Sequence, residues 1–343
     1  MLSLFKRRPA AKTPGFPAWA APLFDSELAP HTVRPDQSVS VWAIKADTST
    51  ATITEQFKAN AEEYHQRYAH SDHFQRLFEG GLAASQIKVA AKPLILDLGS
   101  GSGVNSVVPC QRLFPGARVV ATDLSGELLR ILADYTAHTG TFGDVVCVVM
   151  DAMSSHVRPG VFDLVTGASI LHHLERPEAG IAAAGRALKP GGHAIFFEPF
   201  YGWSVVRAAY ERVLAEAEVR KPGLDPDIAW VLKAMSADIA ARTSPDPTSP
   251  VLAALDDKWL FSRDQIQWMA RNAGFETIHI IPHNDHPTLY RDTTSVQLRL
   301  ASGRSDLELP DWALAVLDTF DDALSTAAKR DLLLEGTVVL TKR

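Results

Sequence analysis

Short apolar runs alternate with stretches of helical periodicity through the middle of the chain. Five of these runs are nearly unbroken, which is typical of strands buried on both faces of a parallel sheet. They cover residues 94–96, 119–124, 145–150, 162–165 and 193–197. The alternation of such strands with helices predicts an α/β fold in which helices cover both faces of the sheet.

The first of these runs leads into a glycine-rich turn, LILDLGSGSG at residues 94–103. Its glycines let the backbone take positive φ and let a ligand approach closely. The helix expected after the turn offers free N–H groups at its N-terminus to an anionic part of the ligand. A strand, a glycine-rich turn and a helix in this order indicate a nucleotide site at the switch point of an open α/β sheet.

The spacing of the glycines separates two classes of nucleotide site. In the dinucleotide fingerprint G-x-G-x-x-G the third glycine would fall at position 104, which is Val104, whereas here it comes one residue early, at Gly103. Asp97 adds a carboxylate two residues before Gly99. A carboxylate there suits a ligand with an ammonium group and repels a diphosphate. An NAD-dependent oxidoreductase is therefore the least favoured function.

The pattern D-x-G-x-G-x-G resembles motif I of class I S-adenosylmethionine (SAM)-dependent methyltransferases. Asp123 and Asp151 each end a later strand, and a turn L-K-P-G-G at 188–192 precedes the fifth strand, as in that family. Asp123 lies about 20 residues beyond the turn, the distance at which an acid binds ribose hydroxyls. The resemblance covers about residues 55–200 strongly and 260–343 weakly. It implies a Rossmann-like sheet of seven strands.

The resemblance also implies SAM as the cofactor. It assigns the adenine amino group to Asp151, the ribose hydroxyls to Asp123, and closure over the cofactor to an aromatic residue such as Tyr64. Simple packing of an amphipathic helix on the core is the alternative for Tyr64. The implied cofactor-binding residues are Asp97, Gly99, Ser100, Gly101, Gly103, Asp123, Leu124, Asp151, Ala152, Ala168 and Tyr64.

Composition and periodicity predict an arm and an entry helix before the core strands. Residues 1–50 are rich in Pro, Ala and Ser and predict an irregular N-terminal arm. Residues 51–199 then carry the SAM-binding core, which opens with a helix over 52–83 because apolar residues recur there at helical spacing.

The part of the chain after the fifth strand is longer than a minimal core needs. Residues 200–260 predict a helical cap insertion, which leaves the sheet at the edge where ligands bind in open α/β folds. Residues 261–343 complete the core sheet and carry a second insertion at 283–330. The two further strands are expected at 275–281 and 336–341.

The candidate catalytic residues follow the fourth and fifth strands. Histidine titrates near neutral pH and suits general-base work, and one of His172 and His173 should face the site because neighbours on an extended segment point oppositely. Which of the two does so is left open. Glu198 could orient a histidine, help to remove a proton or bind the acceptor. The alternatives are a histidine that only shapes the turn and an ion pair of Glu198 with a residue such as Arg207.

Composition excludes several classes of protein. The net charge of −6 over 343 residues gives no basic footprint for nucleic acid. Cys110 and Cys147 fall in an expected helix and strand, and we predict buried thiols in a reducing compartment. No apolar run has membrane-spanning length, and the basic start lacks the apolar part of a secretory signal, so a cytoplasmic protein is expected. The stretch H-N-D-H at 283–286 has metal-ligand types, but without a further ligand motif we expect a polar loop and no metal site.

These features together predict a SAM-dependent methyltransferase that acts on an oxygen atom, hydroxyl or carboxyl, of a small molecule. A small-molecule N- or C-methyltransferase and a SAM-binding protein without turnover are the alternatives. A nucleic-acid or protein-amide methyltransferase is disfavoured, because the sequence GASI at 167–170 stands where those enzymes carry N/D-P-P-Y/F. The identity of the acceptor and the oligomeric state are left open by the sequence.

Overall fold

The computed structural model describes residues 15–33, 41–45, 57, 60–68, 71–139, 144–154, 156–243, 255–283, 287–304 and 306–343. One mixed sheet has the strand order β1-β2-β5-β4-β3-β6-β7-β9-β8, in which β1 and β9 run antiparallel to their neighbours. The strands are β1 (Leu28–His31), β2 (Val41–Ile44), β3 (Leu94–Leu98), β4 (Arg118–Asp123), β5 (Val145–Val149), β6 (Phe162–Ala168), β7 (Leu188–Pro199), β8 (Phe275–Pro282) and β9 (Glu335–Lys342).

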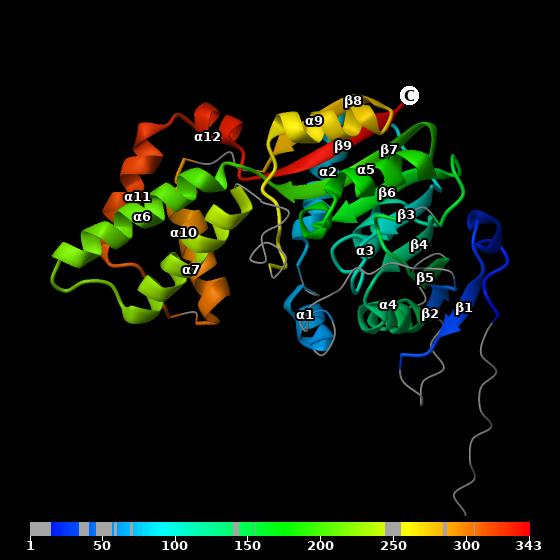
Figure 1. The fold of residues 1–343 in the computed structure, drawn as a ribbon, viewed down its shortest axis with the longest axis horizontal. Coiled ribbons are helices and arrows are strands. Elements are labelled where there is room, and N and C mark those ends of the chain that lie inside the picture. The colour runs from blue at the N-terminus through cyan, green and yellow to red at the C-terminus, as the bar shows by residue number, and fades with distance from the viewer. Residues whose placement is uncertain are drawn as a thin grey trace, which may run out of the picture.

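Helices cover both faces of this sheet (Figure 1). Successive side chains of a strand point to opposite faces. In β3, Ile95 packs in a cluster with residues of α2, α3 and α4, whereas Leu96 packs with residues of α5 and α9. The helices are α1 (Ala61–Tyr68), α2 (His73–Ser85), α3 (Val107–Leu113), α4 (Gly126–Thr139), α5 (Pro177–Ala187) and α9 (Arg263–Asn272), with short 3₁₀ helices η1 (Ala21–Leu23) and η3 (Leu171–His173).

The sheet has nine strands, so the expected number of seven is wrong. The seven strands from β5 to β8 in the sheet order form the predicted arrangement, and β2 and β1 extend it beyond β5. Part of the segment expected as an irregular arm is therefore sheet. Trp42 of β2 is buried and meets Phe16 edge to face, with ring centroids 5.0 Å apart. Burial of large aromatic side chains stabilises this strand despite the proline-rich composition around it.

The helix expected over 52–83 is interrupted. The described part forms two helices, α1 and α2, rather than one. Residues 51–56 lie outside the described part of the chain, as do the side chains of Tyr64 and Tyr68.

Two segments far apart in the sequence form one helical cap beside the sheet (Figure 1). Its helices are α6 (Trp203–Val219), α7 (Pro226–Thr243), α10 (Leu289–Ser302), α11 (Asp311–Ala323) and α12 (Thr326–Leu332). Residues of α6, α7, α10 and α11 share a hydrophobic core of their own, in which Tyr210 and Tyr290 are fully buried. The insertions after β7 and before β9 thus pack together. Among the described helices, none is both long and apolar enough to span a membrane.

The strand order places the switch point of the sheet at β3. From β3 the chain proceeds to β4 and β5 on one side and to β6 and β7 on the other. In open α/β sheets, ligands bind outside the carboxyl ends of the strands at such a point. A ligand site is therefore expected at the carboxyl end of β3.

Candidate active site

A cavity lies at the carboxyl ends of β3, β4, β5 and β6. Leu255, Asp256 and Lys258, in the segment that returns from the cap to the core, complete its wall together with Phe57. Nine of the eleven predicted cofactor residues line it: Gly99, Ser100, Gly101, Gly103, Asp123, Leu124, Asp151, Ala152 and Ala168. Asp97 does not line the cavity, and the side chain of Tyr64 lies outside the described residues.

The glycine-rich turn is packed on one side and open on the other. Gly103 has a φ of +78°, and a Cβ there would lie 2.3 Å from Leu132 Cδ1. Gly101 has a φ of +54°, but a Cβ there would meet only Leu128, at 3.9 Å. The turn therefore closes tightly on α4 at Gly103 and leaves space for a ligand at Gly101.

Hydrogen bonds fix this turn to the end of β4. Asp123 accepts from the backbone N–H of Gly101 at 2.8 Å and from that of Ser125 at 2.7 Å. Ser100 N–H donates to the carbonyl of Thr122 at 2.8 Å, and its Oγ accepts from Thr122 N–H at 3.0 Å. Burial raises the pKa of Asp123, and its backbone hydrogen bonds oppose that rise. Each carboxylate oxygen has a second lone pair, so Asp123 can still accept from ligand hydroxyls.

Asp97 lies beneath the turn rather than in the cavity. It is fully buried and accepts from the hydroxyls of Thr166 at 2.5 Å and Ser106 at 2.6 Å. Burial raises its pKa to about 6, although its hydroxyl partners lower it. The carboxylate that the sequence assigned to an ammonium group thus joins β3, β6 and the start of α3.

The cavity carries buried polar atoms that fit the expected cofactor. Asn105 Oδ1 and Ser102 Oγ line it and have no hydrogen-bond partner among the described residues. Buried polar groups are normally hydrogen-bonded, so these atoms indicate a ligand with donors of its own. SAM carries an ammonium group, ribose hydroxyls and an adenine amine, and the cavity is lined by two carboxylates that can accept hydrogen bonds, Asp123 and Asp151. The residues present therefore fit SAM.

His173 and His172 belong to η3, which follows β6, and they face different ways. His173 lines the cavity, whereas His172 is buried behind it with Nδ1 2.7 Å from Glu198 Oε2. The fully buried Glu198 also accepts from the backbone N–H groups of Leu171 at 2.8 Å and His172 at 3.2 Å. It therefore orients both the ring of His172 and the start of η3. The alternative partner, Arg207, pairs with Glu211 instead.

The pKa values of the two histidines are shifted in opposite directions. Burial lowers the pKa of His172, but the carboxylates of Glu198 and Asp257 raise it further, to about 10. Burial lowers the pKa of His173, and the charge on His172 adds to this, to about 4. His173 is therefore neutral at pH 7. Its Nδ1 donates to the carbonyl of Asp256 at 3.0 Å, which leaves Nε2 as the proton acceptor.

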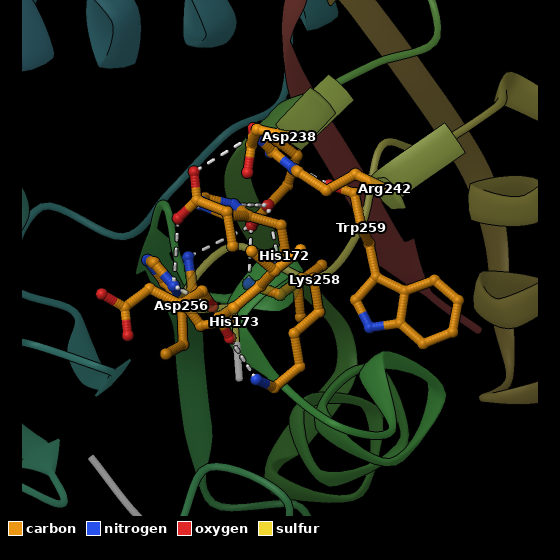
Figure 2. A network of polar contacts seen from close by, with 12 residues as sticks. His172, His173, Asp238, Arg242, Asp256, Lys258 and Trp259 are labelled. Atoms are coloured by element: carbon orange, nitrogen blue, oxygen red, sulfur yellow. Dashed lines mark hydrogen bonds and ion pairs between the residues drawn. The ribbon is translucent and has the colours of Figure 1, made fainter. Parts of the chain in front are cut away.

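A group of polar residues from the cap surrounds these histidines (Figure 2). Asp257 lies 3.6 Å from His172 Nε2 and 3.4 Å from His173 Nδ1. Arg242, near the end of α7, contacts Asp257 at 3.3 Å and Asp238 at 3.2 Å. These three cap residues were not predicted from the sequence. Their only sequence signal is the i, i+4 spacing of Asp238 and Arg242, which ordinarily indicates a surface pair on a helix.

The two residues that follow Asp257 are hydrogen-bonded to η3 and to the residue after it. Lys258 N–H donates to the carbonyl of His172 at 2.7 Å, and Trp259 Nε1 donates to the carbonyl of Leu174 at 2.7 Å. The cap thus reaches the histidines through backbone as well as side-chain contacts.

Residues 96–196 match the family model of a methyltransferase domain. The chain is 32% identical over 102 residues to a ubiquinone biosynthesis O-methyltransferase from Idiomarina loihiensis, which covers 30% of this chain and 40% of that protein. It is 28% identical over 151 residues to a ubiquinone/menaquinone biosynthesis C-methyltransferase from Marinomonas sp., which covers 42% of this chain and 60% of that protein. The matches thus span less than two thirds of these relatives.

Among solved structures, the fold is similar to that of phosphoethanolamine N-methyltransferase 2 from Haemonchus contortus in complex with S-adenosyl-L-methionine. The TM-score is 0.45 at 16% sequence identity, with 85% of this chain and 60% of that chain covered.

Proposed function

We propose that this protein, whose residues 96–196 match the model of a methyltransferase domain, transfers a methyl group from SAM to an oxygen of a small molecule. The observation that carries this proposal is that one cavity is lined by two groups of residues. The glycine-rich turn, Asp123 and Asp151 form the first group, the donor end, and the neutral His173 belongs to the second, the histidine end.

The donor end would hold the cofactor by hydrogen bonds. Asp123 would accept from the ribose hydroxyls and Asp151 from the adenine amine, while the open space at Gly101 admits the ligand close to the backbone. When bound, the cofactor would supply a methyl group on a positively charged sulfur, and the acceptor oxygen would attack the methyl carbon in line with the carbon–sulfur bond that breaks. Because the reacting atoms must be held close and aligned, positioning is a large part of catalysis.

His173 is the proposed proton acceptor for a hydroxyl substrate. Burial and the charge on His172 keep its pKa near 4, so Nε2 is unprotonated at neutral pH. Glu198 acts as a positioning residue, because it fixes η3 and the neighbouring ring. A carboxylate acceptor needs no base, so with such a substrate His173 would only shape the cavity.

The test is a transfer assay with SAM labelled in the methyl group and a panel of hydroxyl and carboxylic acid compounds. With a hydroxyl acceptor, His173→Gln should lower the rate by about 10²–10⁴-fold, the usual contribution of a general base. His138→Gln, an exposed histidine on α4, is the matched control and should leave the rate unchanged. Label found on carbon or nitrogen would favour the alternative acceptors. Failure of folded protein to bind SAM would contradict the proposal.

A further inference from the structure

Three residues beside the cavity bring atoms that can bind a metal close together. They are His172, His173 and Asp257. His172 is buried, and His173 and Asp257 are partly buried. One ligand atom from each lies within 4.8 Å of the other two. The first two residues belong to the core and the third to the segment that returns from the cap. This group was not indicated by the sequence, in which Asp257 lies more than 80 positions after the histidines.

The distances are close to those of a tetrahedral metal site. Asp257 Oδ1 lies 3.6 Å from His172 Nε2 and 3.4 Å from His173 Nδ1. With metal–ligand bonds of about 2.0–2.1 Å, tetrahedral geometry places ligand atoms roughly 3.3–3.4 Å apart. The carbonyl oxygen of Asp256, 3.0 Å from His173 Nδ1, is a fourth donor next to the group. Both distances to Asp257 Oδ1 thus lie within about 0.3 Å of the tetrahedral value, and the three ligand atoms all lie within 4.8 Å of one another.

The surroundings of the group are those of supported metal ligands. Glu198 accepts from His172 Nδ1 at 2.7 Å, which leaves the Nε2 of a neutral ring free to bind a cation. Carboxylates hold metal-binding histidines in this way and fix the tautomer. Arg242 contacts the other carboxylate oxygen of Asp257, Oδ2, at 3.3 Å, so Oδ1 stays directed at the histidines. Figure 2 shows the histidines and Arg242 within one network of contacts.

The charge balance also favours a cation. Three carboxylates and one guanidinium take part in these contacts: Glu198 contacts His172, and Arg242 contacts Asp238 and Asp257. With both histidines neutral, these groups leave an excess of negative charge at a largely buried place. Such an excess needs a counter-charge, which is either a proton on His172 or a bound cation.

We propose that His172, His173 and Asp257 bind a divalent cation of the zinc type, with the carbonyl of Asp256 as a fourth donor. Imidazole and carboxylate ligands suit Zn²⁺, and Co²⁺ or Ni²⁺ can substitute for it. The cation joins the cap to the core at the edge of the cavity. Coordination through Nδ1 leaves the proton of His173 on Nε2, so the cation blocks the general-base role of this residue. This last consequence, but not the site, rests on the proposed function.

The experiment uses the full chain without an affinity tag, freed of metal with a chelator and then dialysed against Zn²⁺. Metal analysis should give one tightly held equivalent per chain, and Co²⁺ should give the visible absorption of a tetrahedral site. Asp257→Asn should weaken retention at least 10-fold. Glu198→Gln should weaken it about 10–100-fold, the usual effect of removing a partner of a metal-binding histidine.

Two control variants should retain the metal as the wild type does. Asp318→Asn alters an aspartate that is likewise paired with an arginine and similarly exposed, and His138→Gln alters an exposed histidine. Circular dichroism shows whether each variant is folded. Asp257 is the decisive position, because its side chain is 42% exposed and its replacement should leave the fold intact.

Two results would overturn the cation site: no Zn²⁺ retained by folded wild-type protein, or equal retention by Asp257→Asn. A proton on His172 would then be the counter-charge. Titration of the same samples with S-adenosylhomocysteine (SAH) separates this outcome from failure of the proposed function. SAH binding without metal binding overturns only the cation site, and metal binding without SAH binding overturns only the proposed function.

Discussion

The two ends of the cavity are built in different ways. At the donor end, each important residue stands at or just after the carboxyl end of a neighbouring strand, as Gly101, Asp123 and Asp151 do. At the histidine end, contacts join η3 to the end of β7 and to residues 256–259, which in turn contact the end of α7 through Asp257 and Arg242. Trp259 in this segment is bonded to a carbonyl 85 positions away. The donor end thus follows from the topology of the sheet, and the histidine end depends on how the cap is seated. Changes in the two insertions can therefore alter the histidine end, where the acceptor is proposed to bind, and leave the donor end unaltered.

The largest effect is expected from a substitution at the most tightly packed position of the donor end, Gly103. Gly103→Ala should lower the free energy of unfolding by about 2–4 kcal/mol, because the new Cβ would overlap Leu132 at a positive φ. Gly191→Ala is the matched control, since Gly191 has a φ of +75° but nothing within 4 Å of a Cβ. That change should cost about 1 kcal/mol from backbone strain alone. Urea unfolding measures both, and equal losses would contradict the packing described for the turn.

The buried carboxylate beneath the glycine-rich turn, Asp97, should make the free energy of unfolding depend on pH. The pKa of Asp97 is about 6 in the folded protein, compared with 3.8 for an unperturbed aspartate such as that of the unfolded chain. The folded state therefore binds the proton more tightly. Stability from this group is therefore present at low pH and declines as the pH rises from about 4 to 6, by up to roughly 3 kcal/mol. Asp97→Asn should lack this decline. Urea unfolding of both proteins at several pH values tests the difference, and parallel curves would contradict the assignment.

The buried carboxylate of the histidine end should affect stability and leave cofactor binding intact. Glu198→Gln leaves His172 without its charged partner and weakens the anchoring of η3, so a loss of about 1–3 kcal/mol is expected. SAH affinity should change less than about threefold, because Glu198 does not line the cavity. Glu211→Gln, in a surface pair with Arg207, should cost less than about 1 kcal/mol. A large loss of SAH affinity in Glu198→Gln would show that the two ends are not separable.

The same contrast explains what the sequence could predict. Positions such as Gly103 and Asp123 follow from local spacing, because a strand, its turn and the next helix are consecutive in the chain. The choice between His172 and His173 could not be predicted from alternation, because they lie in a 3₁₀ helix that follows Ser169 at a φ of +60°. Strand β2 was missed because its pairing with β5 joins segments about 100 residues apart. Asp257 was missed for the same reason, since only the seating of the cap brings it to η3.

The most direct test of the account is isothermal titration with SAH of the wild type, Asp123→Asn and His173→Gln. The account predicts that Asp123→Asn weakens binding at least about 30-fold, as expected for loss of hydrogen bonds to a charged group. It predicts that His173→Gln changes the affinity less than about threefold. Equal losses in the two variants, or no loss in Asp123→Asn, would contradict the division of the cavity into a donor end and a histidine end.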